Sequence, residues 1–488
     1  MTIEKIKELL DVCYQAKRVR ELLPDVPFST HRTETVRDRL QAERPAVELA
    51  CAYLSGDRTA AVRAAYDYYK DDERVKNAQV QRRGRGPLSS PHTIDGLYGK
   101  SLNLTASRVD TFYSCRFAFF MQYGLKAKPR RVARFDALST GTFIHYVLEH
   151  ALDALGKCEG GAAHADQPTV RKACREAVRQ YVAEELGGLE NKTARFQYLF
   201  RRLVRAVEQI LDNVIEELRV SDFAPIDYEL DFSRSGDLPP VQCEDGDVSV
   251  SLSGKVDRVD GYIKNGRLYL RVMDYKSGKK SFSLSDIWYG LNMQLIIYLY
   301  ALQQEGRDRY RARLTAELNE IVPAGVLYVP VRDELPDAAR DTDEEGLRIL
   351  RDKALRRSGL LSDDMSLLEA MEHGLEGDGR FIPVSIKTGK GEDEPTLAAK
   401  SAVADLAKFG RLARYTQKKL LEMGQALRNG SIEADPRKTD RSYCEWCDFR
   451  AACRFDETAG DKVRWLKNIK DKEFWEQLGG DDNAEVDT

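Results

Sequence analysis

The sequence predicts an α/β fold, a mixed sheet flanked by helices with helical insertions. Apolar residues between positions 226 and 277 alternate with a period of two, which is typical of strands that bury one face. The segments on both sides, 142–220 and 283–304, instead carry apolar residues at helical spacing. A buried strand, AGVLYVPV at 324–331, comes next, and the order strand, helix, strand is typical of an α/β core.

The individual elements are expected from the same periodicities. Strands at 226–232, 248–263 and 267–277 would form a three-stranded antiparallel unit, with a hairpin turn at Asn265-Gly266. The other expected elements are long helices over 142–220 with a glycine-rich break near 156–162, a helix at 283–304, a helical insertion at 333–378, a strand at 381–386 and a long helix at 395–429.

Composition divides the chain into four segments. Residues 1–80 are expected to be a helical N-terminal segment, and 81–94, rich in Arg, Gly, Ser and Pro, a linker. Residues 95–460 would form the main domain. Residues 461–488 are expected to form a helix and an acidic tail, disordered after about position 478.

Length and charge limit the class of protein. A chain of 488 residues can bury a core without disulfides, and its net charge of -3 neither indicates nor excludes a nucleic-acid partner. No apolar run approaches the roughly 18 residues of a membrane span, and the N-terminus lacks a secretory apolar core. We therefore expect a cytoplasmic protein without a membrane span. Two basic clusters could line a local groove, although charge runs are more often solvated surface: Arg82, Arg83 and Arg85, and Lys126, Lys128, Arg130, Arg131 and Arg134.

The segment VMDYKSG carries the most informative chemistry. Asp274 and Lys276 are two apart on an expected strand and so project from the same face. Asp257 lies on the partner strand, where a hairpin can bring it beside Asp274. Phosphodiester hydrolysis uses such a set, because carboxylates bind Mg²⁺ or Mn²⁺ and a lysine stabilises developing negative charge. Taken alone, however, an Asp and a Lys on a strand more often form a surface ion pair.

Further residues in a fixed order change that balance. They are His145 on an expected helix, Glu229 in a strand, Asp257, Asp274 and Lys276, and then Gln294 and Tyr298, which share one helical face. This ordered set resembles the nuclease domain of the RecB family in the PD-(D/E)XK superfamily, whose sheet is restriction-endonuclease-like. The resemblance implies that His145, Glu229, Asp257 and Asp274 contribute to a metal site. It implies that Lys276 is the catalytic lysine, and that Gln294 and Tyr298 help to hold DNA or the active-site strand.

Four cysteines suggest a second site. Cys444, Cys447 and Cys453 form a C-x2-C-x5-C pattern, and Cys115, in an aromatic-rich segment, is the best candidate for a fourth ligand. Four thiolates bind either zinc or an iron–sulfur cluster, and spacing alone leaves both open. The remaining cysteines lack such spacing and are expected to be ordinary thiols: Cys13, Cys51, Cys158, Cys174 and Cys243.

The arrangement of the cysteines resembles that of the AddB subunits of AddAB helicase–nucleases. In both, one early cysteine and a late C-x2-C-x5-C flank the nuclease motifs. The resemblance covers roughly residues 95–460, with Arg116 where the family usually has proline. It implies a [4Fe-4S] cluster that acts as a structural staple, an AddA-type helicase–nuclease partner, and cleavage of single-stranded DNA in double-strand-break repair. Members of that family are much longer, so residues 1–80 would be a remnant of their helicase-like region. The chain is then expected to be a C-terminal piece, an encoded short form or a truncated product.

Two other functions remain open. One is a non-catalytic DNA-binding scaffold, against which the intact Asp257, Asp274 and Lys276 argue. The other is a stand-alone iron–sulfur exonuclease of the CRISPR-adaptation type, which copurification with a helicase would distinguish.

Overall fold

The structure, a computed structural model, describes residues 42–54, 56–82, 86–128, 137–314, 318–331, 338–339, 341–387, 395–453, 455–457 and 461–484. The chain divides into two compact units, one within Met1–Gly86 and one formed by Pro87–Glu457 and Asp461–Thr488. Among the described residues, no helix combines the length and the apolar character needed to cross a bilayer.

The first unit is helical where it is described. Its helices are α4 (Glu43–Leu54), α5 (Ala60–Tyr69) and α6 (Glu73–Arg82). They bury a small core that includes Leu49, Ala50, Val62 and Val75. Residues 1–41 and most of the two basic clusters lie outside the described residues. The expected linker 81–94 is partly helical, since α6 reaches Arg82 and α7 begins at Pro91.

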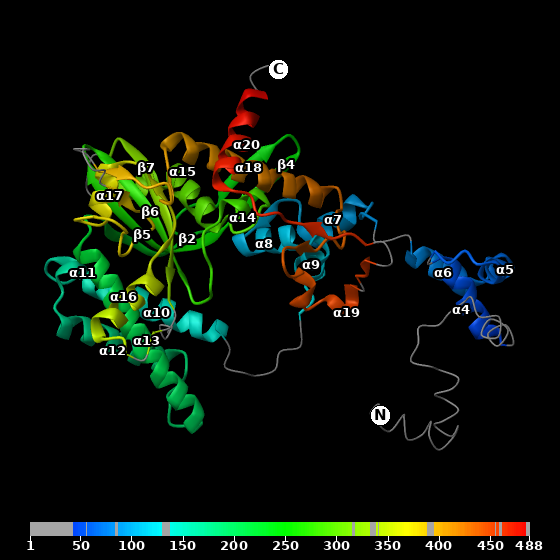
Figure 1. The fold of residues 1–488 in the computed structure, drawn as a ribbon, viewed down its shortest axis with the longest axis horizontal. Helices are drawn as coiled ribbons and strands as arrows, with labels where there is room; N and C mark the ends of the chain where they lie inside the picture. The colour runs from blue at the N-terminus through cyan, green and yellow to red at the C-terminus, as the bar shows by residue number, and fades with distance from the viewer. Residues whose placement is uncertain are drawn as a thin grey trace. The chain divides into compact units, whose positions relative to one another are not determined.

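A six-stranded mixed sheet forms the centre of the second unit (Figure 1). Its strand order is β11 (Val403–Ala404), β8 (Ser358–Ser362), β7 (Glu320–Pro330), β6 (Arg267–Lys276), β5 (Gly254–Lys264) and β2 (Ala224–Phe232). The β2–β5–β6 unit is antiparallel, whereas β6 and β7 run parallel. Asn265 (φ 53°) and Gly266 (φ 72°) both adopt positive φ, the conformation of the tight hairpin turn predicted there.

Different helices cover the two faces of this sheet (Figure 1). On one face, Leu270 and Val272 pack with residues of α15 (Gln294–Leu314) and α18 (Leu406–Arg428). On the other, Met273 and Tyr275 pack with α10 (Ala137–Gly156), α12 (Gln167–Glu184) and α13 (Ala194–Arg219). The predicted α/β class, a mixed sheet flanked by helices, is confirmed. The expected glycine-rich break near 156–162 separates α10 from the short α11 (Gly161–His164).

Smaller elements complete the unit. The helices are α7 (Pro91–Tyr98), α8 (Ala106–Ser114), α9 (Arg116–Phe119), the π-helix Phe120–Gly124, α14 (Leu284–Trp288), α16 (Glu344–Leu355), α17 (Met365–Met371), the 3-10 helix Tyr443–Glu445, α19 (Arg450–Cys453) and α20 (Asp471–Ala484). The strands are β1 (Leu102–Leu104), β3 (Val241–Asp245) and β4 (Val248–Leu252) in a second sheet, β9 (Ile386–Lys387) paired with β10 (Thr396–Leu397), and β12 (Arg437–Lys438) paired with β13 (Arg464–Trp465).

Several predicted boundaries were wrong. The expected strand 248–263 is two strands, because the chain leaves β4 at Ser253 and enters β5 in the other sheet. The expected helical insertion 333–378 contains β8, whose sequence SGLLS is too short to show a period. The helix expected from 395 begins at Leu406, after the cap Asp405. The expected disordered tail is helical to Ala484.

A buried carboxylate explains another error. The segment 381–386 was expected to be a strand, but only Ile386 belongs to one. The Glu372 side chain accepts the backbone N–H groups of Phe381 at 3.0 Å and Ile382 at 3.1 Å. Those donors would have to serve a neighbouring strand if the segment were extended in a sheet.

The expected helix 283–304 is interrupted between α14 and α15. Gly290 (φ 77°) and Asn292 (φ 54°) take positive φ there, which ends one helix and redirects the chain. The interruption makes Gln294 the first residue of α15.

Candidate active site

Three predicted ligands from distant parts of the chain converge at the sheet. His145 of α10 directs Nδ1 toward Asp257 Oδ1 of β5, at 3.5 Å, and toward Glu229 Oε1 of β2, at 3.8 Å. One ligand atom from each of these three residues lies within 4.8 Å of the others. Among the described residues, His145, Glu229 and Asp257 are the His, Cys, Asp or Glu side chains that lie close enough together to share one metal ion.

Glu229 reaches the group through an unusual backbone. The register pairs Tyr228 with Arg258 and Leu230 with Val256, so Glu229 lies opposite Asp257. Its φ of 47° is in the left-handed region, which costs a residue with a side chain roughly 1–2 kcal/mol. Such strain persists where the surrounding structure enforces it and is frequent at functional sites.

His145 is oriented by the neighbouring strand. Its Nε2–H donates to the backbone carbonyl of Tyr275 at 3.0 Å, which leaves Nδ1 facing the carboxylates. The N–H of Tyr275 donates to Asp257 Oδ2 at 2.7 Å. Burial opposes protonation of His145, but Asp257 and Glu229 outweigh it and raise the pKa of His145 to about 10. Without a metal, a proton therefore occupies the position facing the two carboxylates.

Asp274 lies beside this group in β6 and is 1 % exposed. Burial, reinforced by the Asp257 carboxylate, raises the pKa of Asp274 to about 7, although Lys276 opposes the shift. Its Oδ2 is paired with the Lys276 ammonium but is buried without a hydrogen bond of good geometry. Burial and the neighbouring Asp257 thus disfavour the charged form of Asp274, and a cation bound between the two carboxylates would favour it.

Gln294 ties the active-site strand to α15. Its Nε2 donates to Asp274 Oδ1 at 2.8 Å and to the Tyr298 hydroxyl at 3.1 Å. Its Oε1 accepts from the Lys276 ammonium at 3.3 Å. One amide therefore contacts Asp274, Lys276 and Tyr298, and all seven residues predicted for this site lie together.

The donor set fits a hard divalent cation. Carboxylate oxygens from Glu229, Asp257 and Asp274 and an imidazole nitrogen are ligands that Mg²⁺ and Mn²⁺ accept. The raised pKa of Asp274 and the proton that His145 holds toward Asp257 and Glu229 both mark positions where a metal ion would supply charge.

Three of the four predicted cysteine ligands lie in a separate apolar cluster. Cys115 and Cys453 are buried with Phe117 and Phe449, and Cys447 packs against them. Cys444 follows at the 3-10 helix, where its N–H donates to Ser442 Oγ. Burial raises the pKa of the Cys115 thiol to about 12, while N–H groups of Ala118, Asp435 and Phe117 point to its sulfur and lower it. Thiols supplied with N–H donors in an apolar pocket are a suitable donor set for a soft metal centre. Of the other cysteines, Cys51, Cys158, Cys174 and Cys243 are free thiols, and Cys13 lies outside the described residues.

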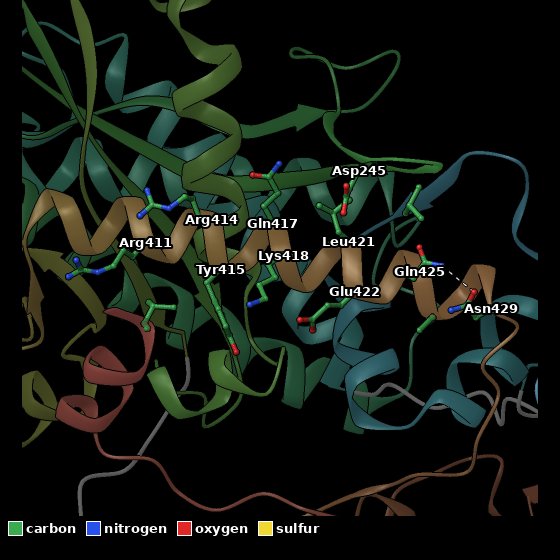
Figure 2. A pocket seen from close by; sticks show the side chains of 13 residues that line it. Asp245, Arg411, Arg414, Tyr415, Gln417, Lys418, Leu421, Glu422, Gln425 and Asn429 are labelled. Carbon is green, nitrogen blue, oxygen red and sulfur yellow. Dashed lines mark hydrogen bonds between the residues drawn. The ribbon is translucent and has the colours of Figure 1, made fainter. Parts of the chain in front are cut away.

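A groove of about 730 Å³ runs along α18 (Figure 2). Arg411, Arg414 and Lys418 line it together with Asp245 and Glu422. None of the predicted site residues lines this groove, so it is distinct from the carboxylate site.

Two residues near the carboxylates, Lys280 and Tyr328, were not predicted from the sequence. Lys280 and Lys276 each place an ammonium group over the ring of Tyr328, at 5.2 Å and 5.7 Å from its centroid. Tyr328 lies directly opposite Asp274 in the register of β7 and β6. The run KSGKK contained the signal for Lys280, but the sequence did not show which lysine turns back to the site.

Comparisons with known proteins agree with this geometry. Residues 103–454 match the model of the PD-(D/E)XK nuclease superfamily. The chain is 33% identical over 392 residues to the B-type subunit of the ATP-dependent helicase/deoxyribonuclease of Ruminiclostridium cellulolyticum, covering 79% of this chain and 33% of that protein. The protein of the same name from Clostridium botulinum strain Loch Maree is 34% identical over 397 residues, with the same coverage of 79% and 33%. That of Clostridium tetani is 29% identical over 448 residues, covering 89% of this chain and 37% of the relative.

The chain thus spans about a third of the length of these relatives. The superfamily match covers most of it and includes all seven residues of the carboxylate site as well as Cys115 and the late cysteines. The chain belongs to the PD-(D/E)XK nuclease superfamily.

Proposed function

We propose that this chain is a divalent-metal-dependent deoxyribonuclease that cleaves single-stranded DNA. The observation that carries the proposal is a group of three side chains that could hold a metal ion, His145, Glu229 and Asp257, beside Asp274, one lysine and one bridging amide. A sheet surface that served only packing or DNA binding would not need to bury a carboxylate whose pKa is raised to about 7 by burial and by the neighbouring Asp257.

Each residue has a distinct role in this proposal. His145, Glu229, Asp257 and Asp274 hold Mg²⁺ or Mn²⁺, which supplies Lewis-acid activation of water and of the phosphoryl group. Lys276 directs its ammonium toward the reacting phosphate and stabilises the charge that develops there. Gln294 keeps Lys276 and Asp274 in register, and Tyr298 supports the Gln294 amide.

A second proposal concerns the cysteines. We propose that Cys115, Cys444, Cys447 and Cys453 hold a [4Fe-4S] cluster, which fastens the start of the domain to its end. Backbone contacts between the same segments support this, since Phe117 N–H donates to Glu433 O at 2.9 Å and Arg116 N–H to Asp435 Oδ1 at 2.9 Å. The role is structural, because the cysteines are separate from the carboxylates.

The names of the relatives suggest a setting. Each relative is named as one of the subunits of a helicase/deoxyribonuclease, so we propose an AddA-type helicase–nuclease partner that supplies unwound DNA during double-strand-break repair. A reducing, cytoplasmic location is consistent with cysteines kept as thiols or metal ligands.

The nuclease proposal is tested with the anaerobically purified chain and a labelled single-stranded oligonucleotide, with Mg²⁺, Mn²⁺ or EDTA. We expect metal-dependent cleavage that Asp274→Ala reduces by about a hundredfold or more. Asp247→Ala, which removes an exposed carboxylate from the turn between β3 and β4, is the matched control and should leave the rate unchanged. Undiminished cleavage by Asp274→Ala would refute the site. Binding without cleavage by the wild type, even with the helicase partner added, would favour the scaffold function.

The cluster and the partner have separate tests. The wild type should contain iron and acid-labile sulfide in equal amounts. Cys158→Ser changes an exposed thiol and should keep the same content, whereas Cys447→Ser should lose both iron and sulfide. Zinc in place of iron would contradict the cluster. Failure to copurify with an AddA-type protein, combined with robust cleavage by the chain alone, would favour the stand-alone exonuclease.

A further inference from the structure

A second lysine, Lys280, lies beside the proposed active site and forms no close ion pair among the described residues. Lys280 lies in the segment between β6 and α14, and its ammonium lies 5.2 Å from the centroid of the Tyr328 ring. The Lys276 ammonium lies 5.7 Å from the centroid of the same ring. Two ammonium groups therefore flank one aromatic ring, and that ring is on the residue directly opposite Asp274.

The backbone holds Lys280 in place. Its own N–H donates to Gly278 O at 2.9 Å, and two residues later Phe282 N–H donates to Ser358 Oγ of β8 at 2.9 Å. The following Ser283 caps α14 by accepting the N–H of Asp286. The backbone of the segment is thus attached to the sheet on one side and to a helix on the other, and the Lys280 side chain lies over the Tyr328 ring.

Three carboxylates lie near Lys280, those of Asp110, Asp274 and Asp286, and each also accepts hydrogen bonds from other groups. Asp110 Oδ1 accepts the backbone N–H of Asn292 at 2.7 Å, and Asp286 Oδ2 accepts from the Asn292 side chain at 2.6 Å. Asp274 is held by Lys276 and Gln294. In the part of the chain that the structure describes, Lys280 forms no ion pair of its own, although it is only partly exposed. Burial lowers the pKa of Lys280, and Lys276 adds to that effect, whereas Asp110, Asp274 and Asp286 oppose it.

A partly buried ammonium group that has carboxylates nearby but no close ion pair gains a charge-assisted hydrogen bond when an anionic ligand reaches it. Because Lys280 lies beside Lys276 and Tyr328, an anion that it binds would belong to the same ligand that occupies the carboxylate site. The structure assigns to Lys280 the binding of a DNA backbone phosphate next to the one that is cleaved. This inference rests on the proposed nuclease function, and it adds a substrate-positioning residue to the site.

The test measures binding without cleavage, in EDTA, by fluorescence anisotropy of a labelled single-stranded oligonucleotide over a range of salt concentrations. Each phosphate neutralised on single-stranded DNA contributes about 0.7 to the slope of log affinity against log salt. We expect Lys280→Gln to lower that slope by about 0.7 and to weaken binding about tenfold at low salt, and Lys280→Arg to restore most of both. Lys279→Gln removes the same charge from the exposed neighbouring position and should leave the slope unchanged.

Cleavage kinetics and stability complete the test. In Mg²⁺, Lys280→Gln should raise KM with little change in kcat, because the contact is made equally in the ground state and the transition state. A thermal unfolding curve equal to that of the wild type would exclude a folding defect. A salt slope for Lys280→Gln equal to that of Lys279→Gln and of the wild type would overturn the inference. Because binding is measured without metal, that result would leave the nuclease proposal standing. A wild type that binds DNA with the expected salt slope but never cleaves it would instead refute the nuclease proposal.

Discussion

Replacing Glu217 by Gln should destabilise the fold from a position behind the active site. Glu217, in α13, is 0 % exposed and lies among three buried arginines. The ion pairs of this network are Arg357 Nη2–Glu217 Oε2 at 2.7 Å, Arg271 Nη2–Glu217 Oε1 at 3.2 Å, Arg258 Nε–Asp260 Oδ1 at 2.8 Å and Arg271 Nε–Asp260 Oδ2 at 2.9 Å. Removing one of two anions leaves three buried cations with a single counter-charge.

The expected loss in the free energy of unfolding follows from two considerations. Burial alone would raise the pKa of Glu217, but Arg357, Arg271 and Arg258 outweigh it and lower the pKa from 4.5 to about 2. A depression of that size corresponds to about 3 kcal/mol of stability at neutral pH. Breaking a buried ion pair by removing one partner typically costs about 3–5 kcal/mol. We therefore expect Glu217→Gln to lower the free energy of unfolding by about 3 kcal/mol.

The pH dependence has a definite sign. Because the folded-state pKa is below the unfolded value, the contribution of Glu217 is complete above about pH 4.5 and is lost as the pH falls toward 2. The wild type should thus lose stability over this range more steeply than Glu217→Gln does.

Denaturant unfolding of both proteins at pH 7 and between pH 5 and about 3 checks these expectations. Glu216→Gln is the matched control, because its partly exposed carboxylate pairs with Arg380 at the surface and should contribute under about 1 kcal/mol. A loss for Glu217→Gln no larger than that of Glu216→Gln, or an unchanged pH dependence, would refute the reasoning.

Three further outcomes are expected at the carboxylate site. Gln294→Ala should lower kcat about 10–100-fold by releasing Lys276 and Asp274, whereas Gln304→Ala, exposed on the same helix, should not; equal rates for both would contradict the positioning role. Glu229→Gln keeps the volume of the side chain but removes its charge, so calorimetric Mn²⁺ binding should weaken strongly, and retained binding would remove Glu229 from the ligands. Because the pKa of His145 is raised to about 10, Mn²⁺ must displace its proton, so affinity should rise by about tenfold per pH unit near neutrality, and a pH-independent affinity would contradict this coupling.

The sequence by itself determined the residue types and their order along the chain. Asp274 and Lys276 had to share a face because successive strand residues alternate, and Asn265-Gly266 had to turn because both positions tolerate positive φ. The C-x2-C-x5-C spacing likewise placed three thiols in one short segment. These features depend on local geometry, which a few neighbouring residues decide.

Only the tertiary structure decided which atoms meet. His145 and Glu229 reach Asp257 from a helix and a strand distant in sequence, and the left-handed backbone of Glu229 left no mark in its own sequence. The strand β8 and the break at Ser253 were missed because pairing in a sheet, rather than local periodicity, defines them. Lys280 could not be distinguished from Lys279 by sequence, since both are lysines in a polar run. Their difference comes from which one packs over Tyr328, and packing is settled by contacts between segments far apart in the chain.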